Sequence, residues 1–171
     1  MVRLKIEPVK PMLRPMRWRD LDQEACSVAR TVAVIGDRWT LLVLRDSFLR
    51  VRRFEAFQER LAITRPILAD RLRKLVKSGV LAKQVYQRRP LRYEYRLTPK
   101  GLALHPILLA IVHWGDVHMS GRRGLPMLHR HLACGHTFAP VTTCSVCGDP
   151  VGPREVAVEP GPGAAVRPSA G

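Results

Sequence analysis

Residues 64–97 read TRPILADRLRKLVKSGVLAKQVYQRRPLRYEYRL, and the fold class follows from this segment. Thr64 stands where a helix N-cap belongs, and the proline two residues later is tolerated because first-turn amides have no intrahelical acceptor. The helix is expected to end at Gly79. Two β-prone segments follow, Ala82–Gln87 and Leu91–Leu97, separated by an Arg-Arg-Pro turn. A basic amphipathic helix followed by such a hairpin predicts a winged helix-turn-helix.

Helical periodicity gives this helix two different faces. At roughly 100° per residue, Leu68, Leu72 and Leu75 fall on one face, which is expected to pack against the core. The opposite face is cationic and suits the major groove of a nucleic-acid duplex. If the helix enters the groove by its N-terminal half, the residues nearest the base edges are Thr64, Arg65, Ala69 and Arg73. Further along the helix, Lys74 and Lys77 are expected to contact phosphates, which fix register without reading sequence.

Arginines cluster at the hairpin and before the third expected helix. Arg88, Arg89 and Arg92 lie at or near the turn, where they suit a minor groove or the phosphate backbone. Arg52 and Arg53 are expected to face phosphates from the other side. A surface loop can also be basic for solubility alone, and each basic residue of the helix taken singly is better explained as part of a solvated face. The coincidence of this helix with the basic hairpin favours nucleic acid.

The rest of the central region is predicted to be helical. Apolar residues repeat with helical spacing from Cys26 to Ile35, and Asp37 then stands at an N-cap position before a second apolar stripe. A short helix is expected over Phe54–Leu61. Thr98-Pro99 opens a last helix through about Met119, which carries more apolar residues than one stripe needs, and a two-fold-related copy of the same helix is the simplest partner.

Charge and composition favour a polyanionic partner. The 171-residue chain has a formal net charge of +15, and residues 45–100 hold sixteen Lys and Arg against five Asp and Glu. Nucleic acid ranks ahead of a membrane, because we find no apolar run approaching the roughly 18 residues that spanning requires. A generally Arg-rich composition with solvated charges is the alternative. No dinucleotide-binding glycine motif, P-loop or nucleophile elbow is present, so an enzyme is not expected.

Composition also divides the chain. Residues 1–22 form a basic, Pro-punctuated arm that we expect to be flexible, and it lacks the apolar core of a secretory signal, which favours a cytoplasmic, nucleoid-associated protein. Translation from Met12 or Met16 would shorten this arm. Residues 23–121 are expected to form the winged helix-turn-helix and dimerisation domain, residues 122–158 a Cys/His-rich appendix, and residues 159–171 a disordered tail.

The appendix contains a metal-ligand pattern, HRHLACGHTFAPVTTCSVCGDP at residues 129–150. A Cys-x-x-Cys-Gly turn lets two thiolates meet one tetrahedral ion, and a third cysteine with a neighbouring histidine precedes it. We therefore expect a short metal-ribbon-like extension with one structural zinc ion per chain and the ligands Cys134, His136, Cys144 and Cys147. His131 or His129 could replace His136. A disulfide is the rival for the cysteines, although a reducing cytoplasm disfavours it.

Several segments, taken in their order along the chain, together resemble the HxlR-type winged-helix transcriptional regulators over roughly residues 26–119. The segments are Cys26-Ser27-Val28, Ile35-Gly36-Asp37-Arg38-Trp39-Thr40-Leu41-Leu42-Val43-Leu44-Arg45, Arg53-Phe54-Glu55, Leu68-Ala69-Asp70-Arg71-Leu72, Ser78-Gly79-Val80-Leu81 and Tyr93-Glu94-Tyr95-Arg96-Leu97-Thr98-Pro99-Lys100-Gly101. The resemblance implies a homodimer on an inverted repeat, with one recognition helix and one wing from each protomer. It also implies that Cys26 matches a cysteine that senses electrophiles or oxidants in some members. A lone cysteine among apolar residues is more often inert.

The expected fold is thus mainly α with a small β wing, and the expected function is a sequence-specific regulator of double-stranded DNA, acting as a repressor. Its dimer would form through the helices near residues 26–35 and 99–119. A small-molecule effector or an oxidant could act on it, with any pocket sought between the dimer helices and the winged domain. The alternative is an RNA- or ribosome-associated basic protein, which would prefer RNA and show little sequence discrimination.

Overall fold

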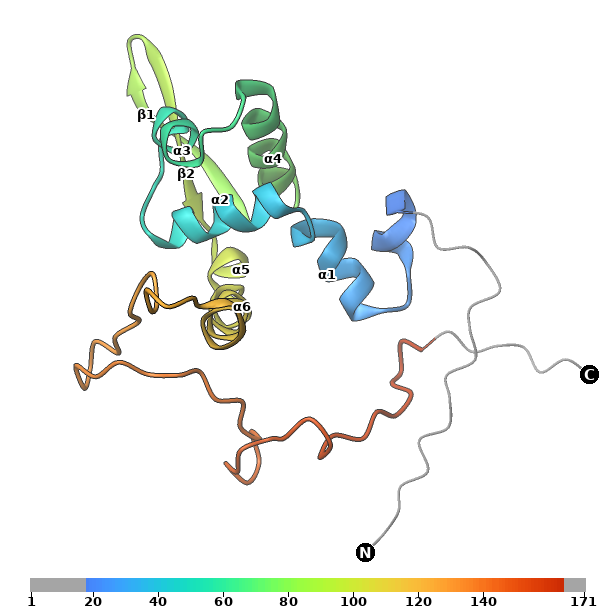
Figure 1. The fold of residues 1–171 in the computed structure, drawn as a ribbon. Coiled ribbons are helices and arrows are strands. Elements are labelled where there is room, and N and C mark those ends of the chain that lie inside the picture. Colours follow the sequence, from blue (N-terminus) through green and yellow to red (C-terminus); the bar gives the residue numbers. More distant parts are fainter. Residues whose placement is uncertain (1–17, 165–171) are drawn as a thin grey trace, which may run out of the picture.

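A computed structural model describes residues 18–164 of the chain (Figure 1). The elements follow in the order η1 (Trp18–Gln23), α1 (Ser27–Ile35), α2 (Arg38–Phe48), α3 (Phe54–Leu61), α4 (Arg65–Lys77), β1 (Leu81–Arg88), β2 (Leu91–Leu97), α5 (Pro99–Leu102) and α6 (His105–Met119). The two strands form an antiparallel sheet directly after α4. This order of helices and hairpin confirms the predicted winged helix-turn-helix.

The core lies where α2, α3, α4 and the base of the wing meet. The predicted apolar face of α4 is confirmed, since Leu68, Leu72 and Leu75 are fully buried. They pack in one cluster with Leu44 of α2 and Phe57 of α3. Burial of a side chain of this size contributes about 1.5–3 kcal/mol. The core therefore fixes the recognition helix by one face and leaves its other face available.

The turn between α3 and α4 depends on one left-handed residue. Ala62 ends α3 with φ 49° and ψ 37°, a conformation that residues with a Cβ adopt at some cost. Ile63 directly after it is buried. The sharp turn and the buried Ile63 together bring α4 across α3, which is the helix-turn-helix arrangement.

The wing has an irregular register, and the segment before α3 pairs with its second strand, which the sequence did not indicate. Val85 pairs with Tyr93 and Gln87 with Arg92, so the ladder shifts between Val85 and Gln87. The backbone amide of Tyr95 donates to the carbonyl of Arg52 at 2.8 Å. The segment before α3 therefore lies along β2, to which an isolated antiparallel bridge between Arg53 and Glu94 joins it.

The expected helix over residues 99–119 is interrupted. The residues between α5 and α6 form turns, and Pro106 stands in the first turn of α6. Proline lacks a backbone N–H, so residue 106 cannot donate to the carbonyl four residues earlier at the end of α5, which accounts for the break. The start of α5 is fixed to the turn between α4 and β1, because the Thr98 hydroxyl donates to the Gly79 carbonyl at 2.7 Å and accepts from the Gly101 amide at 3.1 Å.

The two ends of the chain differ from the central domain. Residues 1–17 and 165–171, which hold most of the expected arm and part of the expected tail, lie outside the described residues. The last part of the arm forms η1, whose Leu21 is buried, so residues 18–22 are helical where we expected a flexible arm. From residue 120 to residue 164 the chain forms turns and isolated bridges without a helix or strand, and Figure 1 shows it as an extended path beyond α6.

Candidate nucleic-acid interface

The N-terminal end of α4 presents the residues expected at base edges. Thr64 and Arg65 are exposed, and the Thr64 side chain makes no capping hydrogen bond to the helix. Ala69 is half-buried. Arg73 is 74% exposed, and its guanidinium is 3.3 Å from the carboxylate of Asp70, one turn earlier. These positions agree with a helix that meets its partner by its first two turns.

Aromatic rings position two of the arginines. The Arg65 guanidinium lies over the ring of Phe54, 4.7 Å from its centroid, and Arg53 lies over the ring of Tyr86 at the same distance. Phe54 begins α3, and Tyr86 belongs to β1. Because Arg53 and Phe54 are adjacent in the chain, the start of α3 connects the N-terminus of α4 to the wing. The arrangement makes one continuous basic surface, and cation–π contacts restrict the side chains that form it.

The two lysines of α4 differ in exposure. Lys77 is exposed, as expected of a phosphate contact, whereas Lys74 is half-buried. A half-buried lysine still keeps its ammonium at the surface when its stem lies along apolar neighbours. Lys77 is therefore the better placed of the two for a phosphate.

The arginines of the wing tip are all exposed. Arg88, Arg89 and Arg92 surround the hairpin turn, and the Gln87 side chain donates to the Arg89 carbonyl at 3.0 Å, across the turn. The Arg89–Pro90 peptide bond is cis. Further from the tip, Lys83 lies 3.9 Å from the centroid of the Tyr93 ring. Lys83 is exposed on β1 and was not among the residues expected at the interface.

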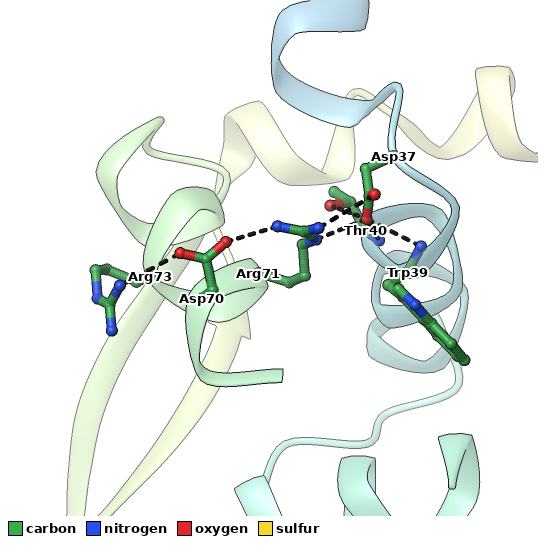
Figure 2. A network of polar contacts seen from close by, with 6 residues as sticks. All are labelled: Asp37, Trp39, Thr40, Asp70, Arg71 and Arg73. Carbon is green, nitrogen blue, oxygen red and sulfur yellow. Dashed lines mark hydrogen bonds and ion pairs between the residues drawn. The ribbon is translucent and has the colours of Figure 1, made fainter. Parts of the chain in front are cut away.

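A polar network holds α4 against the start of α2 (Figure 2). Arg71 donates through Nε to Oδ1 of Asp37 at 2.7 Å and through Nη1 to Oδ2 of Asp70 at 2.6 Å. Asp37 also accepts from the backbone amides of Trp39 and Thr40, at 3.0 and 3.1 Å. Arg71 thus positions the recognition helix from its inner side, a role that the sequence reasoning did not assign.

The protonation of Asp37 follows from this network. Burial by itself would raise the pKa of Asp37, but hydrogen bonds from the Thr40 amide and the Arg71 guanidinium outweigh it, and its pKa lies below the ordinary value of 3.8. The carboxylate is therefore ionised at neutral pH. A charged cap also interacts favourably with the positive end of the α2 dipole.

Comparison with known proteins identifies the family of this winged helix. The family model described as HxlR-like helix-turn-helix matches residues 34–123, more than half of the chain. The chain belongs to the HxlR-like helix-turn-helix family. It is a transcriptional regulator of the helix-turn-helix type and not an enzyme, as the sequence predicted.

This HxlR-like chain has relatives along most of its length. It is 41% identical over 140 residues to an HTH-type transcriptional regulator of Mycobacterium tuberculosis, which covers 82% of this chain and 89% of the relative. A solved structure described as that of a transcription factor is 35% identical with a TM-score of 0.73, covering 81% of this chain and 96% of that one. A second, from Pseudomonas aeruginosa, is 33% identical with a TM-score of 0.59, covering 82% and 95%. The oxidised form of the redox regulator HypR is 32% identical with a TM-score of 0.51, covering 56% and 100%.

The remaining features of this HxlR-like chain lie outside the basic surface. Cys26 is exposed at the N-cap of α1, and all four cysteines are free thiols.

A pocket of about 310 Å³ lies between the end of α2, β2 and α5, and Arg50, Arg52 and Arg96 are among its lining residues. The pocket lies between the wing and α5, beside the helical region that the sequence analysis expects to form a dimer. Arg52 lines it and so has a second environment besides the expected phosphate contact.

The expected zinc ligands are not gathered into one cluster. Within residues 18–164, no group of three or more His, Cys, Asp or Glu side chains lies close enough to hold a metal ion. Cys134, His136, Cys144 and Cys147 are instead distributed over two turns of the extension. Zinc binding stays a prediction for these residues.

The helical stretch Pro99–Met119 is long and apolar enough to cross a membrane, with a mean hydropathy of 1.2, contrary to our expectation that no such run exists. Its exposed large apolar residues are Ile107, Ile111, Trp114 and Val117 in α6, with Leu102 in α5 and Met119 at the end of α6. Those of α6 repeat at helical spacing, which gives one apolar stripe. His113 and Asp116 are half-buried on another side of the helix. A stripe of this kind suits a partner helix better than surrounding lipid.

Proposed function

We propose that this HxlR-like regulator is a homodimeric repressor that binds an inverted-repeat operator in double-stranded DNA. Each protomer would place α4 in a major groove and its wing against the flanking backbone. The observation that carries the proposal is the connection at the start of α3. There Arg65 stacks on Phe54 while the neighbouring Arg53 stacks on Tyr86, which joins the recognition helix and the wing in one cationic surface.

The dimer is supported by the exposed stripe of α6. Trp114 and Val117 are each 60% exposed in the single chain. Exposing a stripe of large apolar side chains to water is unfavourable, and such stripes usually mark a contact surface. In a two-fold assembly the same stripe of both chains would pack together. Two recognition helices would then contact successive half-sites about one helical turn apart, so an inverted repeat is the expected operator.

A competition gel shift tests the proposal. Labelled duplex from the promoter next to the protein's own gene should be displaced by the same unlabelled duplex and poorly by random duplex or by RNA. Preferential displacement by RNA would overturn it in favour of an RNA- or ribosome-associated protein. A promoter–reporter fusion measured with and without the regulator gives the direction of control, and reporter expression that rises with the regulator would overturn the repressor role.

We further propose that Cys26 is the residue through which oxidants act. The supporting observations are its exposure at the N-cap of α1 and the likeness of the winged domain to the redox regulator HypR. A thiol at a helix N-terminus is accessible to diamide or a quinone. Operator release by diamide should be lost in Cys26→Ser. Unchanged release in that variant would exclude Cys26 as the sensor.

The pocket beside α5 is the proposed site for a small-molecule effector. Its three arginines favour an anionic compound, and Tyr95 and Phe48 supply aromatic surface. Because β2 and α5 both line the pocket, an occupant would bear on the wing and the dimer helices at once. Effector screening with the Arg96→Ala variant as control tests this site. A compound that releases DNA equally well from both proteins acts elsewhere.

A further inference from the structure

The extension contains two turns that are built in the same way. In the first, the amide of Gly135 donates to the carbonyl of His131 at 2.8 Å, and the amide of His131 donates to the carbonyl of His136 at 2.9 Å. Gly135 has φ 74°, a left-handed conformation that glycine adopts without strain. An isolated bridge between Arg130 and Thr137 closes the turn.

The second turn repeats every one of these features. The amide of Gly148 donates to the carbonyl of Cys144 at 2.9 Å, and the amide of Cys144 donates to the carbonyl of Asp149 at 2.8 Å. Gly148 has φ 80°. A bridge between Thr143 and Pro150 closes this turn. The sequences His131-x-x-Cys134-Gly135 and Cys144-x-x-Cys147-Gly148 are therefore structural equivalents.

Each turn brings two metal-ligating side chains together. In the first, Nδ1 of His131 is 3.3 Å from Sγ of Cys134. In the second, the backbone amides of Cys147 and Val146 and the side chain of Cys147 hydrogen-bond to Cys144, so the two cysteines lie side by side.

The equivalence assigns the fourth ligand. His131 stands in the first turn where Cys144 stands in the second, whereas His136 stands where Asp149 stands. The residues His136 and Asp149 close their turns through their backbone carbonyls. His131, the alternative to His136 that the sequence left open, is thus the histidine at a ligand position.

The extension has turns of fixed form but no apolar core. Leu132 and Val146, inside the two turns, are 94% and 93% exposed. A segment that buries so little apolar surface needs another source of stability, and small metal-binding units obtain it from the bound ion. The first turn has one anchor, because His129, Phe138 and Pro140 line a small pocket with residues of α6.

We propose that each chain binds one structural zinc ion through His131, Cys134, Cys144 and Cys147. Three thiolates and one imidazole form the tetrahedral set that closed zinc sites use, with two ligands from each turn. Within the described chain the two pairs of ligands lie apart, with residues 135–143 between them. Binding of one ion by both pairs requires this segment to fold back so that both turns face the ion. Since the first turn is anchored to α6, the ion fixes the whole extension beside that helix.

The test uses the full chain purified without chelators. Elemental analysis should give about one zinc ion per chain, and replacement by Co²⁺ should produce the visible absorption bands of tetrahedral cobalt with thiolate-to-metal charge transfer. The variants His131→Ala and Cys144→Ala should lose the metal or hold it far more weakly. The matched controls His136→Ala and His129→Ala should retain one ion per chain. A mercurial reagent added to the unmutated protein should release the zinc, which keeps the test valid if a variant fails to fold.

Four outcomes would overturn the proposal. Zinc absent from the purified protein would remove the site, and half an ion per chain would place it between two subunits. Loss of zinc in His136→Ala with retention in His131→Ala would reverse the ligand assignment. A thiol titration of the denatured, unreduced protein that finds fewer than the four cysteines of the sequence would instead indicate a disulfide. Operator binding is a separate readout, so its loss or retention does not decide the metal.

Discussion

Nε of Arg71 donates a hydrogen bond to Oδ1 of Asp37 across 2.7 Å, and the same carboxylate caps the N-terminus of α2 (Figure 2). One side chain therefore starts a core helix and holds the recognition helix in place. Both side chains are 26% exposed, so the pair is only partly screened by water. Asp70 binds the other side of the Arg71 guanidinium, which restricts its rotation.

Replacing Asp37 by alanine should destabilise the domain by about 1–3 kcal/mol. Loss of an N-cap costs about 1 kcal/mol, and the remainder comes from Arg71 losing its partner. Urea unfolding followed by circular dichroism measures the change. Glu59→Ala, which removes an exposed carboxylate from α3, is the control and should leave the midpoint nearly unchanged. Equal midpoints for the two variants would show that the network contributes little.

Asp37 also predicts how stability depends on pH. Its folded-state pKa lies below the ordinary value of 3.8, so the carboxylate stabilises the fold fully above that value, and the contribution is lost as pH falls through the lower folded-state pKa. The free energy of unfolding should therefore fall less steeply in acid for Asp37→Asn than for the unmutated chain. Urea titrations at several pH values between about 6 and 2 test this, because linkage fixes the sign of the slope. Parallel pH profiles for the two proteins would contradict it.

The fold was predictable because its strongest pattern is local. Leu68, Leu72 and Leu75 give the buried face of α4 by spacing alone, and the capping position of Asp37 is visible in the sequence. Contacts between distant segments were not predictable. The pairing of Arg52 with Tyr95 and the bond from Arg71 to Asp37 depend on how elements approach one another. Helical periodicity predicts which face of a helix a residue occupies, but it does not identify the residue that it contacts on another element.

In the candidate interface, too, the exposure of single residues was predictable from the sequence and the contacts between elements were not. Exposure of Thr64, Arg65 and Arg89 agrees with the sequence, whereas the stacking of Arg65 on Phe54 needed the arrangement of α3 and α4. The break before α6 was missed because the apolar residues continue through it, although Pro106 was a local indication. His131 was open to assignment only when the two turns could be compared in space.

Arg65→Ala should weaken binding to the cognate operator by about 1–3 kcal/mol and relax discrimination at one position, since a bidentate arginine–guanine pair contributes that much. Phe54→Leu removes the ring that positions Arg65 and should weaken the same binding by less. Because both changes act through one side chain, the double variant should be no weaker than Arg65→Ala alone. Gel shifts on the operator and on point-mutated operators measure these effects. Additive losses would show that the stacking does not position Arg65.

Arg89→Ala should weaken binding to all duplexes similarly. A wing-tip arginine that contacts phosphate carries no sequence information, and its removal should reduce the slope of log K against log salt by about 1. Titrations of cognate and random duplex at several salt concentrations give both quantities. Arg89→Lys keeps the charge and should keep the slope. A loss confined to the cognate duplex would instead assign a base contact to the wing.

Trp114→Glu should convert the proposed dimer to a monomer without unfolding the chain. Trp114 is 60% exposed and Ile111 46% exposed, so an acidic side chain at position 114 meets solvent in the monomer but the partner's apolar stripe in the dimer. Light scattering after size exclusion should show the halved mass, and circular dichroism should show retained helix content. The inverted repeat should then be bound more weakly, because the two half-sites are no longer linked in one molecule. Val158→Glu makes the same change at a 93% exposed residue of the extension and should leave the dimer intact. A monomeric unmutated protein would contradict the dimer outright, and its recovery in a membrane fraction would show that the apolar stripe of α6 faces lipid.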